Sequence, residues 1–444
     1  MSILPTEWIT RSVAPRVAAA AQAPRSTRER LDATLRRDRE ALSPRALRKT
    51  LTELLAIVDP AVSEVEGGRR ASVFAAWYAA AAPEERHDCW LLMSEQFVLD
   101  QTKAQAAQAE YAAAVGTPDQ PVAEVRLRRA TVSPRRRLLQ RFSVLPDGIR
   151  FLVDMRADML PFQKADKRLQ ALDVEMEYMF STWFDVGFLE LRRISWDSPA
   201  SLLEKLIKYE AVHDIRSWAD LKNRLDSDRR CYGFFHPRLE GEPLIFVEVA
   251  LMDGVAQGIT PLLDETAAPA DLAKATAAVF YSISNTQAGL RGVSFGDSLI
   301  KRVVDTLKEE FPRLKTFSTL SPVPGLRAWL AGNAPGDLLL ALDDPLAIDA
   351  RSPVRAQLLG WAARYLGKEL QDGKPLDPVA RFHLGNGARV ERINWAGDPS
   401  PKGLKQSYGL MVNYLYDLRR LDKHRSQLAQ GQIPISGAIE ALYF

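Results

Sequence analysis

The sequence predicts an α+β protein of two domains. A chain of 444 residues is too long for one compact core. Residues 26–180 show helical periodicity almost throughout, whereas short apolar runs separated by turn residues begin near residue 186. We therefore expect an all-α helical domain over residues 1–185 and a mixed α/β domain over residues 186–444.

The composition is that of an ordinary soluble globular protein. Hydrophobic residues make up 46% of the chain and charged residues 26%, with a net charge of +3. This near-balance gives no global reason to expect nucleic acid or an anionic membrane as a partner, although a local patch could still bind a phosphate-rich small ligand. No run of 18 apolar residues occurs, so we expect no membrane span.

The cysteines and histidines bound the metal and redox chemistry. The two cysteines, Cys89 and Cys231, cannot form a disulfide framework or a Cys-rich metal site. The five histidines are scattered without an HExxH motif or a close pair, which disfavours zinc. The first 25 residues are rich in Arg and Ala, which faintly resembles a transit peptide, but a disordered start and a cytoplasmic protein are the favoured interpretation.

Three segments characterise the helical domain. Arg28 to Leu42 mixes charges with leucines at helical spacing, and Phe97 to Val115 contains seven alanines before a Gly-Thr-Pro turn. Val125 to Phe142 holds seven arginines. Those arginines could contact nucleic acid or an acidic partner, but flanking acidic residues favour a solvated helix face or a subunit contact.

The second domain begins with strands and short helices. We expect a strand near Phe188–Ile194 and a hairpin formed by Arg230–Phe235 and Leu244–Leu251. Helices are expected at Ala200–Tyr209 and Ser217–Leu225. A helix at Leu272–Ala278, a strand at Val279–Ser284, a helix ending before Pro312 and a strand at Lys315–Ser321 complete this part. The last three elements form a βαβ unit, whose strands should be parallel.

The remainder of the chain is predicted to contain a helical part followed by a part with both strands and helices. Residues 326–378 are predicted to be mainly helical, and a mixed section follows from Ala380. Within it, Ala380–Gly387 is expected to form a short strand and a turn, and Arg389–Trp395 to be its hairpin partner.

The loop at residues 285–297 has the composition of an anion site. Gly289, Gly292 and Gly296 allow close backbone approach, Arg291 adds a positive charge, and a helix begins directly after Asp297. The loop matches neither GxGxxG nor the P-loop, so dinucleotide and P-loop binding are disfavoured. A tight βα turn that uses glycine only for its geometry remains an equal alternative.

Two polar residues stand out beyond this loop. Ser321 ends a buried strand and precedes Pro-x-Pro-Gly, which is where α/β proteins place ligand groups. A serine that only caps its own turn would look the same, and no GxSxG elbow is present. His383 is a lone histidine, which is more often structural than catalytic. Spacing alone does not bring His383 to Ser321.

Five segments of the second domain carry a distinctive sequence pattern. The longest is FYSISNTQAGLRGVSFGDSLIKRVVDTLKEEFPRLKTFSTLSPVPGLRAWL from Phe280. The others are GFLELRRISWDSPAS from Gly187, YEAVHDIRSWADLKNRL from Tyr209, CYGFFHPRLEGEPLIFVEVAL from Cys231 and FHLGNGARVERINWAGDPSPKGLKQSYGLMVNYLY from Phe382. These segments closely resemble the malonyl-CoA decarboxylase family. The resemblance covers residues 187–420, and the helical first half suits the family's N-terminal domain in size.

The resemblance implies a function and a site. It implies a lyase of fatty acid metabolism that converts malonyl-CoA to acetyl-CoA and CO2, a GNAT-like catalytic domain and a homotetramer. It implies that Ser321, in SPVPG, and His383, in FHLGNG, form a catalytic pair. It also implies that the CoA pyrophosphate is bound by the loop Arg291, Gly292, Val293, Ser294, Phe295, Gly296 and Asp297.

The expected mechanism uses no metal and no organic cofactor, because the thioester itself accepts the electron pair. We expect His383 to protonate the carbanion as general acid, with a pKa of about 6.5, the ordinary value for imidazole. Ser321 would orient the malonyl carboxylate or relay a proton. Backbone N–H groups near residues 279–284, or Asn285, would stabilise the enolate. The alternative function is a GNAT-type acyltransferase, and a third possibility is a non-catalytic sensor of malonyl-CoA.

Overall fold

The computed structural model describes Thr27, residues 41–293, Phe295 and residues 299–443. Its chain contacts define two compact units. The first contains the residues up to Leu145 together with Phe162–Leu172, and the second contains Pro146–Pro161 and everything from Asp173. The predicted boundary at residue 185 lies between the helix Gln170–Trp183 and the first strand, which begins at Glu190. The contact-based division falls earlier in the chain.

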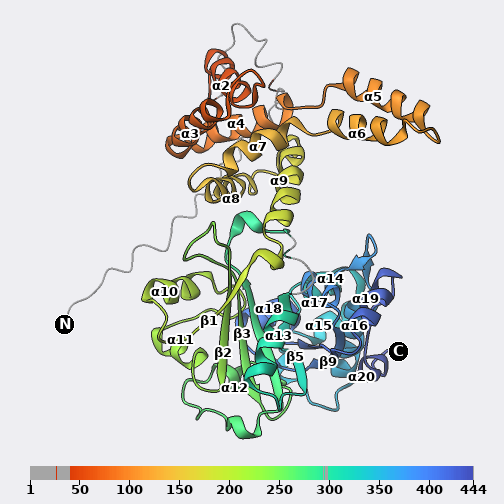
Figure 1. The fold of residues 1–444 in the computed structure, drawn as a ribbon. Helices are drawn as coiled ribbons and strands as arrows, with labels where there is room; N and C mark the ends of the chain where they lie inside the picture. The colour runs from red at the N-terminus through yellow and green to blue at the C-terminus, as the bar shows by residue number, and fades with distance from the viewer. Residues whose placement is uncertain (1–26, 28–40, 294, 296–298, 444) are drawn as a thin grey trace. The chain divides into compact units, whose positions relative to one another are not determined.

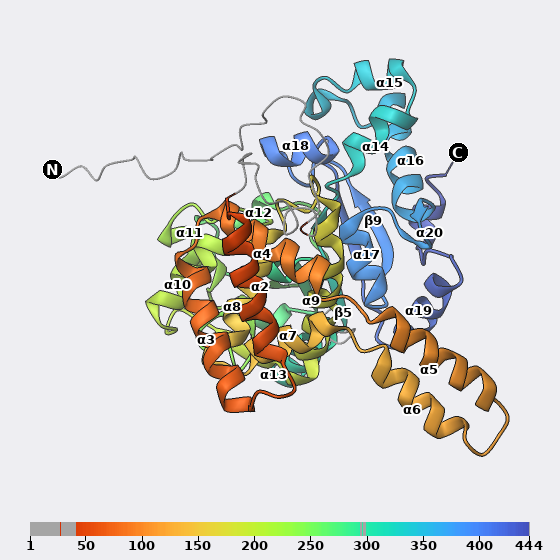
Figure 2. The same cartoon turned by 90° about the horizontal axis from the view of Figure 1, so that it is seen from above.

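The first unit is helical (Figures 1 and 2). Its long helices are α2 (Pro44–Val58), α3 (Glu64–Ala80), α4 (Pro83–Gln96), α5 (Gln101–Ala114), α6 (Gln120–Ala130) and α7 (Pro134–Ser143). Ser43 and Ser63 cap α2 and α3 by accepting backbone N–H groups. Trp90, Phe74 and Phe142 form its buried aromatic centre. The predicted helix at Arg28–Leu42 lies, except for its last two residues, outside the described residues.

The arginine-rich segment is not one helix. Thr131–Ser133 separate α6 from α7. Arg128 pairs with Glu124 at 3.1 Å, Arg141 pairs with Glu64 at 3.1 Å, and Arg126 contacts Glu110. Three of the seven arginines therefore have acidic partners within their own unit.

The second unit is built on an eight-stranded mixed sheet with the order β1-β2-β3-β4-β5-β10-β6, with β9 paired to β10. The strands are β1 (Glu190–Ile194), β2 (Arg229–Phe235), β3 (Pro243–Met252), β4 (Ala277–Asn285), β5 (Thr316–Thr319), β6 (Ser321–Pro322), β9 (Arg389–Asn394) and β10 (Met411–Leu415). All pairs are antiparallel except β4 with β5. The predicted hairpin and the predicted parallel βαβ unit are both confirmed, the latter as β4, α13 (Leu299–Glu310) and β5.

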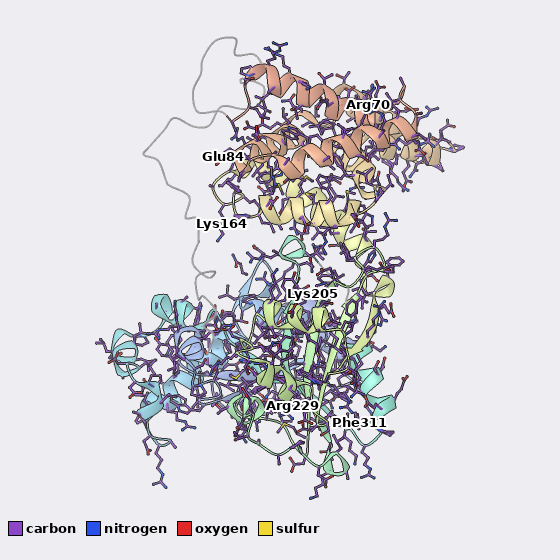
Figure 3. All side chains as sticks on the ribbon, turned by 90° about the vertical axis from the view of Figure 1, so that its left-hand side faces the viewer. Arg70, Glu84, Lys164, Lys205, Arg229 and Phe311 are labelled. Carbon is purple, nitrogen blue, oxygen red and sulfur yellow. The ribbon has the colours of Figure 1, made fainter. Side chains whose placement is uncertain are left out.

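Helices lie beside the sheet, and those of the last part of the chain, drawn in blue, gather around β9 (Figure 1). Leu203 of α10 (Ala200–Tyr209) and Leu221 of α11 (Trp218–Arg224) pack against Cys231 and Phe246. Lys205 of α10, labelled in Figure 3, pairs with Glu242 of the β2–β3 turn at 2.8 Å. The remaining helices are α8 (Gly148–Met159), α9 (Gln170–Trp183), α12 (Thr260–Leu263), α14 (Leu326–Asn333), α15 (Gly336–Ala341), α16 (Pro353–Gly367), α17 (Pro378–Gly385), α18 (Pro401–Ser407), α19 (Leu421–Ala429) and α20 (Gly437–Glu440). A small hairpin, β7 (Leu370–Gln371) with β8 (Lys374–Pro375), precedes α17.

The predicted α+β class is confirmed: a helical N-terminal region is followed by a mixed α/β domain. No helix among the described residues is both long and apolar enough to cross a bilayer.

Two local predictions are wrong. Leu272–Ala278 is not a helix, because only Leu272–Lys274 forms a 3-10 turn and β4 already begins at Ala277. Ala277 and Ala278 are buried between β3 and β5, so the sheet overrides alanine's helical preference. Ala380–Gly387 is not a strand: His383 lies on α17, which Asp377 caps and Pro378 begins.

Candidate active site

Ser321 lies where the strand after α13 is interrupted. β5 ends at Thr319, and Ser321 begins the two-residue strand β6, which pairs with Val412 of β10. The Ser321 side chain is buried, and its hydroxyl donates to Thr319 Oγ1 at 2.9 Å. Thr319 Oγ1 also accepts the Tyr414 backbone N–H at 3.1 Å. Thr319 therefore fixes the orientation of the Ser321 hydroxyl, and the backbone of Tyr414 fixes Thr319.

His383 approaches this hydroxyl from a helix. Its Nε2 lies 3.2 Å from Ser321 Oγ across a sequence separation of 62 residues. The ring is 3% exposed and stacks on Tyr414, with centroids 4.7 Å apart and planes inclined by 27°. The structure thus brings together the two residues that sequence spacing alone could not connect.

Tyr416 occupies the other side of the imidazole. Its hydroxyl is 2.8 Å from His383 Nδ1. Burial raises the pKa of Tyr416 above its ordinary value, so the phenol keeps its proton near neutral pH. A phenol that donates to Nδ1 places the imidazole proton on Nε2, facing Ser321. Sequence reasoning did not identify Tyr416, because a tyrosine just after a buried strand carries no chemical signal by itself.

Burial also decides the charge of His383. Loss of solvation lowers the pKa of His383 from its ordinary value to about 3. The expectation that its pKa stays near 6.5 is therefore wrong for the protein without substrate. At neutral pH the imidazole is uncharged, and a negative partner must arrive before it becomes a strong acid.

Asp377 connects the segments that carry the pair. Its Oδ1 accepts the N–H groups of Val379 and Ala380, at 2.9 and 3.0 Å, and so caps the helix of His383. Its carboxylate also accepts the backbone N–H of Gly325, in the turn that follows Ser321. Tyr365 donates to Oδ2 at 3.3 Å. One buried carboxylate thus holds both the helix and the turn.

A neighbouring polar network fixes β10. Asn413 donates to Thr319 O at 2.6 Å and to Ala256 O at 3.0 Å. Its Oδ1 accepts from Asn394 at 2.8 Å and from Arg392 at 3.2 Å. Arg392 and Asn394 therefore help to fix Asn413 on β10, the strand that pairs with Ser321 and precedes Tyr416.

The predicted CoA loop is only partly described. Arg291 is exposed and Gly292 has a φ of +81°, which favours glycine, while Val293 and Phe295 are buried. Ser294, Gly296 and Asp297 lie outside the described residues. The loop's position as an anion cradle next to α13 thus stays a prediction.

The first part of this loop rests on α8. Arg156, 2% exposed, donates from Nη1 to Gly289 O at 2.7 Å and to Arg291 O at 2.9 Å. Its Nε contacts Asp173 Oδ1 at 2.7 Å. A Cβ at Gly289 would lie 1.9 Å from Val153 O, so only glycine fits this close approach. From the sequence, Gly289 is expected to allow phosphate contact or a tight turn. In the structure, a glycine is required at this position because the backbone of α8 lies too close for any side chain.

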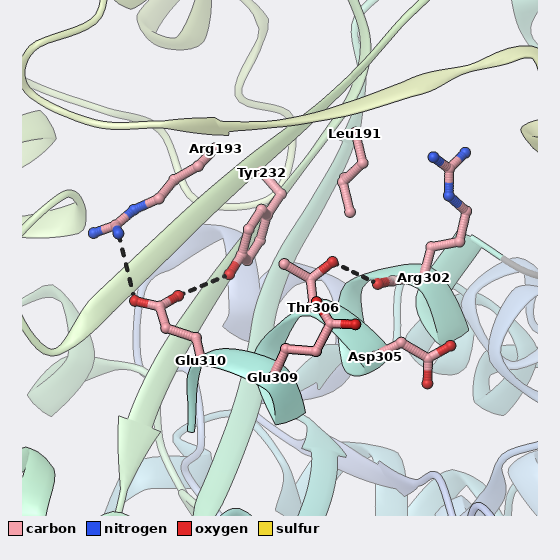
Figure 4. A pocket seen from close by; sticks show the side chains of 8 residues that line it. All are labelled: Leu191, Arg193, Tyr232, Arg302, Asp305, Thr306, Glu309 and Glu310. Carbon is pink, nitrogen blue, oxygen red and sulfur yellow. Dashed lines mark hydrogen bonds and ion pairs between the residues drawn. The ribbon is translucent and has the colours of Figure 1, made fainter. Parts of the chain in front are cut away.

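Two surface pockets have linings that include neither Ser321 nor His383. One of about 420 Å³ lies between β1, β2 and α13 (Figure 4). Its Arg193 pairs with Glu310 at 3.4 Å, and Tyr232 contacts the same carboxylate. Another, of about 620 Å³, is lined in part by His213, whose burial lowers its pKa to about 4. The described residues contain no group of three or more His, Cys, Asp or Glu that could hold a metal ion.

Family models match both parts of the chain. The malonyl-CoA decarboxylase C-terminal domain matches residues 187–443, and the corresponding N-terminal domain matches residues 97–184. The mitochondrial malonyl-CoA decarboxylase of Rattus norvegicus is 40% identical over 334 residues, which cover 67% of this chain and 68% of the rat protein.

Solved structures agree with this. The malonyl-CoA decarboxylase of Rhodopseudomonas palustris is 42% identical, with a TM-score of 0.80 over 89% of this chain and 99% of the other. That of Agrobacterium vitis is 41% identical, with a TM-score of 0.81 over 89% and 100%.

Proposed function

Because the chain belongs to the malonyl-CoA decarboxylase family, we propose that it converts malonyl-CoA to acetyl-CoA and CO2 with Ser321 and His383 as the catalytic pair. The observation that carries the assignment is the 3.2 Å contact between Ser321 Oγ and His383 Nε2 in a buried site. The active site forms from two distant segments, each supported by its own hydrogen bonds.

Decarboxylation of malonyl-CoA leaves an electron pair on the α-carbon, and this pair must be stabilised. When the bond between the α-carbon and the carboxylate carbon breaks, CO2 leaves and the electron pair moves into the thioester as an enolate. The α-carbon then takes one proton to give acetyl-CoA. The thioester serves as the electron sink, so we propose a reaction without a metal or an organic cofactor.

His383 supplies the proton in this scheme. It is uncharged in the free protein, because burial lowers its pKa to about 3. The malonyl carboxylate brings a negative charge next to the ring, and an opposite charge within a few ångströms raises the pKa of an imidazole. His383 therefore takes up a proton from solution as the substrate binds. Because Nε2 already carries a proton, the added proton enters at Nδ1, and the Tyr416 hydroxyl turns to accept it. Nε2 then passes its own proton to the α-carbon, and His383 returns to the neutral form.

Ser321 and Tyr416 set the direction of this transfer. In the free protein Tyr416 donates to Nδ1, which leaves the proton of the ring on Nε2, the nitrogen that faces the substrate. Ser321 exchanges its hydrogen bond with Thr319 for one to the malonyl carboxylate. That bond holds the carboxylate out of the thioester plane, which aligns the breaking bond with the carbonyl π system.

The CoA part of the substrate is assigned to residues 291–297. The N–H groups at the start of α13 and the Arg291 guanidinium suit a pyrophosphate. Arg156 of α8 supports the assignment, because its hydrogen bonds to the carbonyls of Gly289 and Arg291 hold the start of the loop in place.

We also propose that the helical domain of residues 1–185 mediates self-association to a tetramer. One face of α3 carries Gly68, Ser72, Ala76 and Ala80 at intervals of four residues, which allows close helix approach. Val65, Val73 and Trp77 flank this face and are 85%, 58% and 36% exposed. Exposed apolar side chains beside a small-residue stripe fit a second copy of the same helix.

The rat relative is named as mitochondrial. The predicted cytoplasmic location of this chain therefore stays a proposal.

Incubation with malonyl-CoA alone separates this function from acyl transfer. A decarboxylase forms acetyl-CoA and CO2 in equal amounts without an acceptor. An acyltransferase requires an added amine, and a non-catalytic sensor binds without turnover. Absence of acetyl-CoA in this assay would reject the proposed function.

A further inference from the structure

We propose that a pocket beside α19 binds a small multivalent oxyanion, of the class of inorganic phosphate or a short dicarboxylate. The pocket has a volume of about 220 Å³ and lies between α19, β9 and the segment after α19. Its lining includes neither Ser321 nor His383. Its polar lining consists of Arg389, Arg420, Lys423, His424, Gln427 and Gln432.

The charge of the lining points to an anion. Three cationic side chains and no carboxylate line the pocket. Arg389 contacts Glu391 at 2.6 Å and Arg420 contacts Asp417 at 3.5 Å, so each guanidinium has one carboxylate neighbour outside the lining. A guanidinium has five N–H donors, and one carboxylate leaves several of them available. None of the ion pairs found among the described residues involves Lys423.

His424 provides a second, independent observation. It is 5% exposed, and its Nδ1 lies 2.9 Å from Gly387 O. A carbonyl only accepts hydrogen bonds, so Nδ1 carries the proton and Nε2 is the nitrogen available to a ligand. Hydrogen phosphate and a half-protonated dicarboxylate each have an O–H that a neutral Nε2 can accept. A buried ring with one nitrogen fixed in this way suits a ligand with both charge and a hydroxyl.

Size and chemistry together select the ligand class. A volume of about 220 Å³ accommodates a phosphate or a three- to four-carbon diacid with some water, but not a nucleotide. Planar guanidinium groups bind carboxylate and phosphate oxygens in pairs. Gln427 and Gln432 add neutral donors that do not oppose a negative charge.

The pocket is coupled to the catalytic helix by short contacts. Gly387, with a φ of +86°, follows α17, and a Cβ there would lie 2.9 Å from Leu421 O. His424 holds the Gly387 carbonyl, and the next residue, Ala388, donates its N–H to His383 O at 3.1 Å. An anion on His424 therefore acts one hydrogen bond away from the backbone that positions His383. Occupancy should change the turnover number more than the affinity for substrate.

Titration calorimetry on the full chain tests the site, with inorganic phosphate and malonate as separate probes. The test is the double variant Arg420→Gln/Lys423→Gln, and the matched control is Lys405→Gln, an exposed lysine on α18. Saturating CoA is present in a parallel titration, because phosphate could also bind at the CoA loop.

We expect at least one probe to bind with CoA present, about tenfold more weakly in the double variant and unchanged in the control. The probe that binds more tightly identifies phosphate or dicarboxylate as the source. No binding of either probe, complete displacement by CoA, or equal affinity in the double variant would overturn the proposal. Arg420→Lys/Lys423→Arg should retain binding, which separates loss of charge from loss of fold. The site does not depend on the proposed function, so normal decarboxylation without anion binding would refute only the site.

Discussion

His383 Nδ1 lies 2.8 Å from the Tyr416 hydroxyl, on the side of the ring opposite Ser321. This contact makes the imidazole the middle member of a buried row of three side chains. The row explains how one lone histidine, uncharged in the free protein, can be kept in a single tautomer and orientation.

Tyr416→Phe should therefore lower kcat about tenfold and change KM little. The phenylalanine fills the same space but no longer donates to Nδ1, so the imidazole loses its fixed tautomer. Steady-state kinetics with malonyl-CoA measure both constants. Tyr111→Phe on α5, in the helical unit, is the matched control and should leave both unchanged. A Tyr416→Phe protein with normal kcat would show that the phenol does not orient the ring.

Asp377→Ala should lower kcat roughly tenfold while the folded protein keeps its affinity for CoA. Without the carboxylate, α17 loses its cap and the turn at Gly325 loses its acceptor, so Ser321 and His383 are no longer held together. Asp377→Asn keeps a capping oxygen and should recover part of the rate. If Ala and Asn behave alike, or if only thermal stability changes, Asp377 does not position the pair.

Arg156→Lys should raise KM for malonyl-CoA several-fold and affect kcat less. A single ammonium cannot reproduce the fork that holds Asp173 and the carbonyls of Gly289 and Arg291. Arg313→Lys, which changes an exposed arginine that donates to Ala273 O, is the control. An unchanged KM in a folded Arg156→Lys protein would mean that α8 does not support the CoA loop.

Acid should destabilise the protein through its buried neutral histidines. The pKa of His383 is lowered to about 3 and that of His213 to about 4, whereas an unfolded histidine titrates near 6.5. The unfolded chain binds more protons below pH 6.5, so the free energy of unfolding falls as pH drops from about 6.5 towards 3.

Urea unfolding at pH 7 and pH 4.5 measures this loss. His383→Gln removes one of the two groups, so its stability should depend less on pH in this interval. An identical pH dependence in the wild type and the variant would show that His383 is not held neutral by burial.

Ala76→Arg on α3 should lower the oligomeric state, as measured by light scattering. A long charged side chain in the small-residue stripe blocks close helix approach, whereas Ala331→Arg on α14 places the same group on an exposed face elsewhere. An unchanged mass in Ala76→Arg would exclude this face as the subunit contact.

The strands around the site could be predicted because their apolar runs and the turn residues between them indicate the same strand boundaries. Residues 244–251 and 279–282 are buried on both faces. The loop and helix that follow the second strand return the chain to the sheet, so the next strand is expected to pair in parallel with it. His383 was harder to place. The Asp377-Pro378 pair is a helix-start signal in the sequence, but the short apolar segment after it is also compatible with a strand.

Other features depend on tertiary contacts that leave no local signal. The lowered pKa of His383 comes from complete burial, and a chain cannot show from its sequence which histidine loses solvent. The contact of Tyr416 with His383 and the double role of Asp377 likewise depend on how β10, α17 and the turn at Gly325 come together.

The most direct test of the catalytic pair is the rate of acetyl-CoA formation from malonyl-CoA alone in Ser321→Ala and His383→Asn. Ser426→Ala and His236→Asn are the matched controls. Each variant of the pair should lose at least about two orders of magnitude in kcat with little change in CoA affinity, while the controls turn over normally. Wild-type rates in both variants of the pair would contradict the assignment.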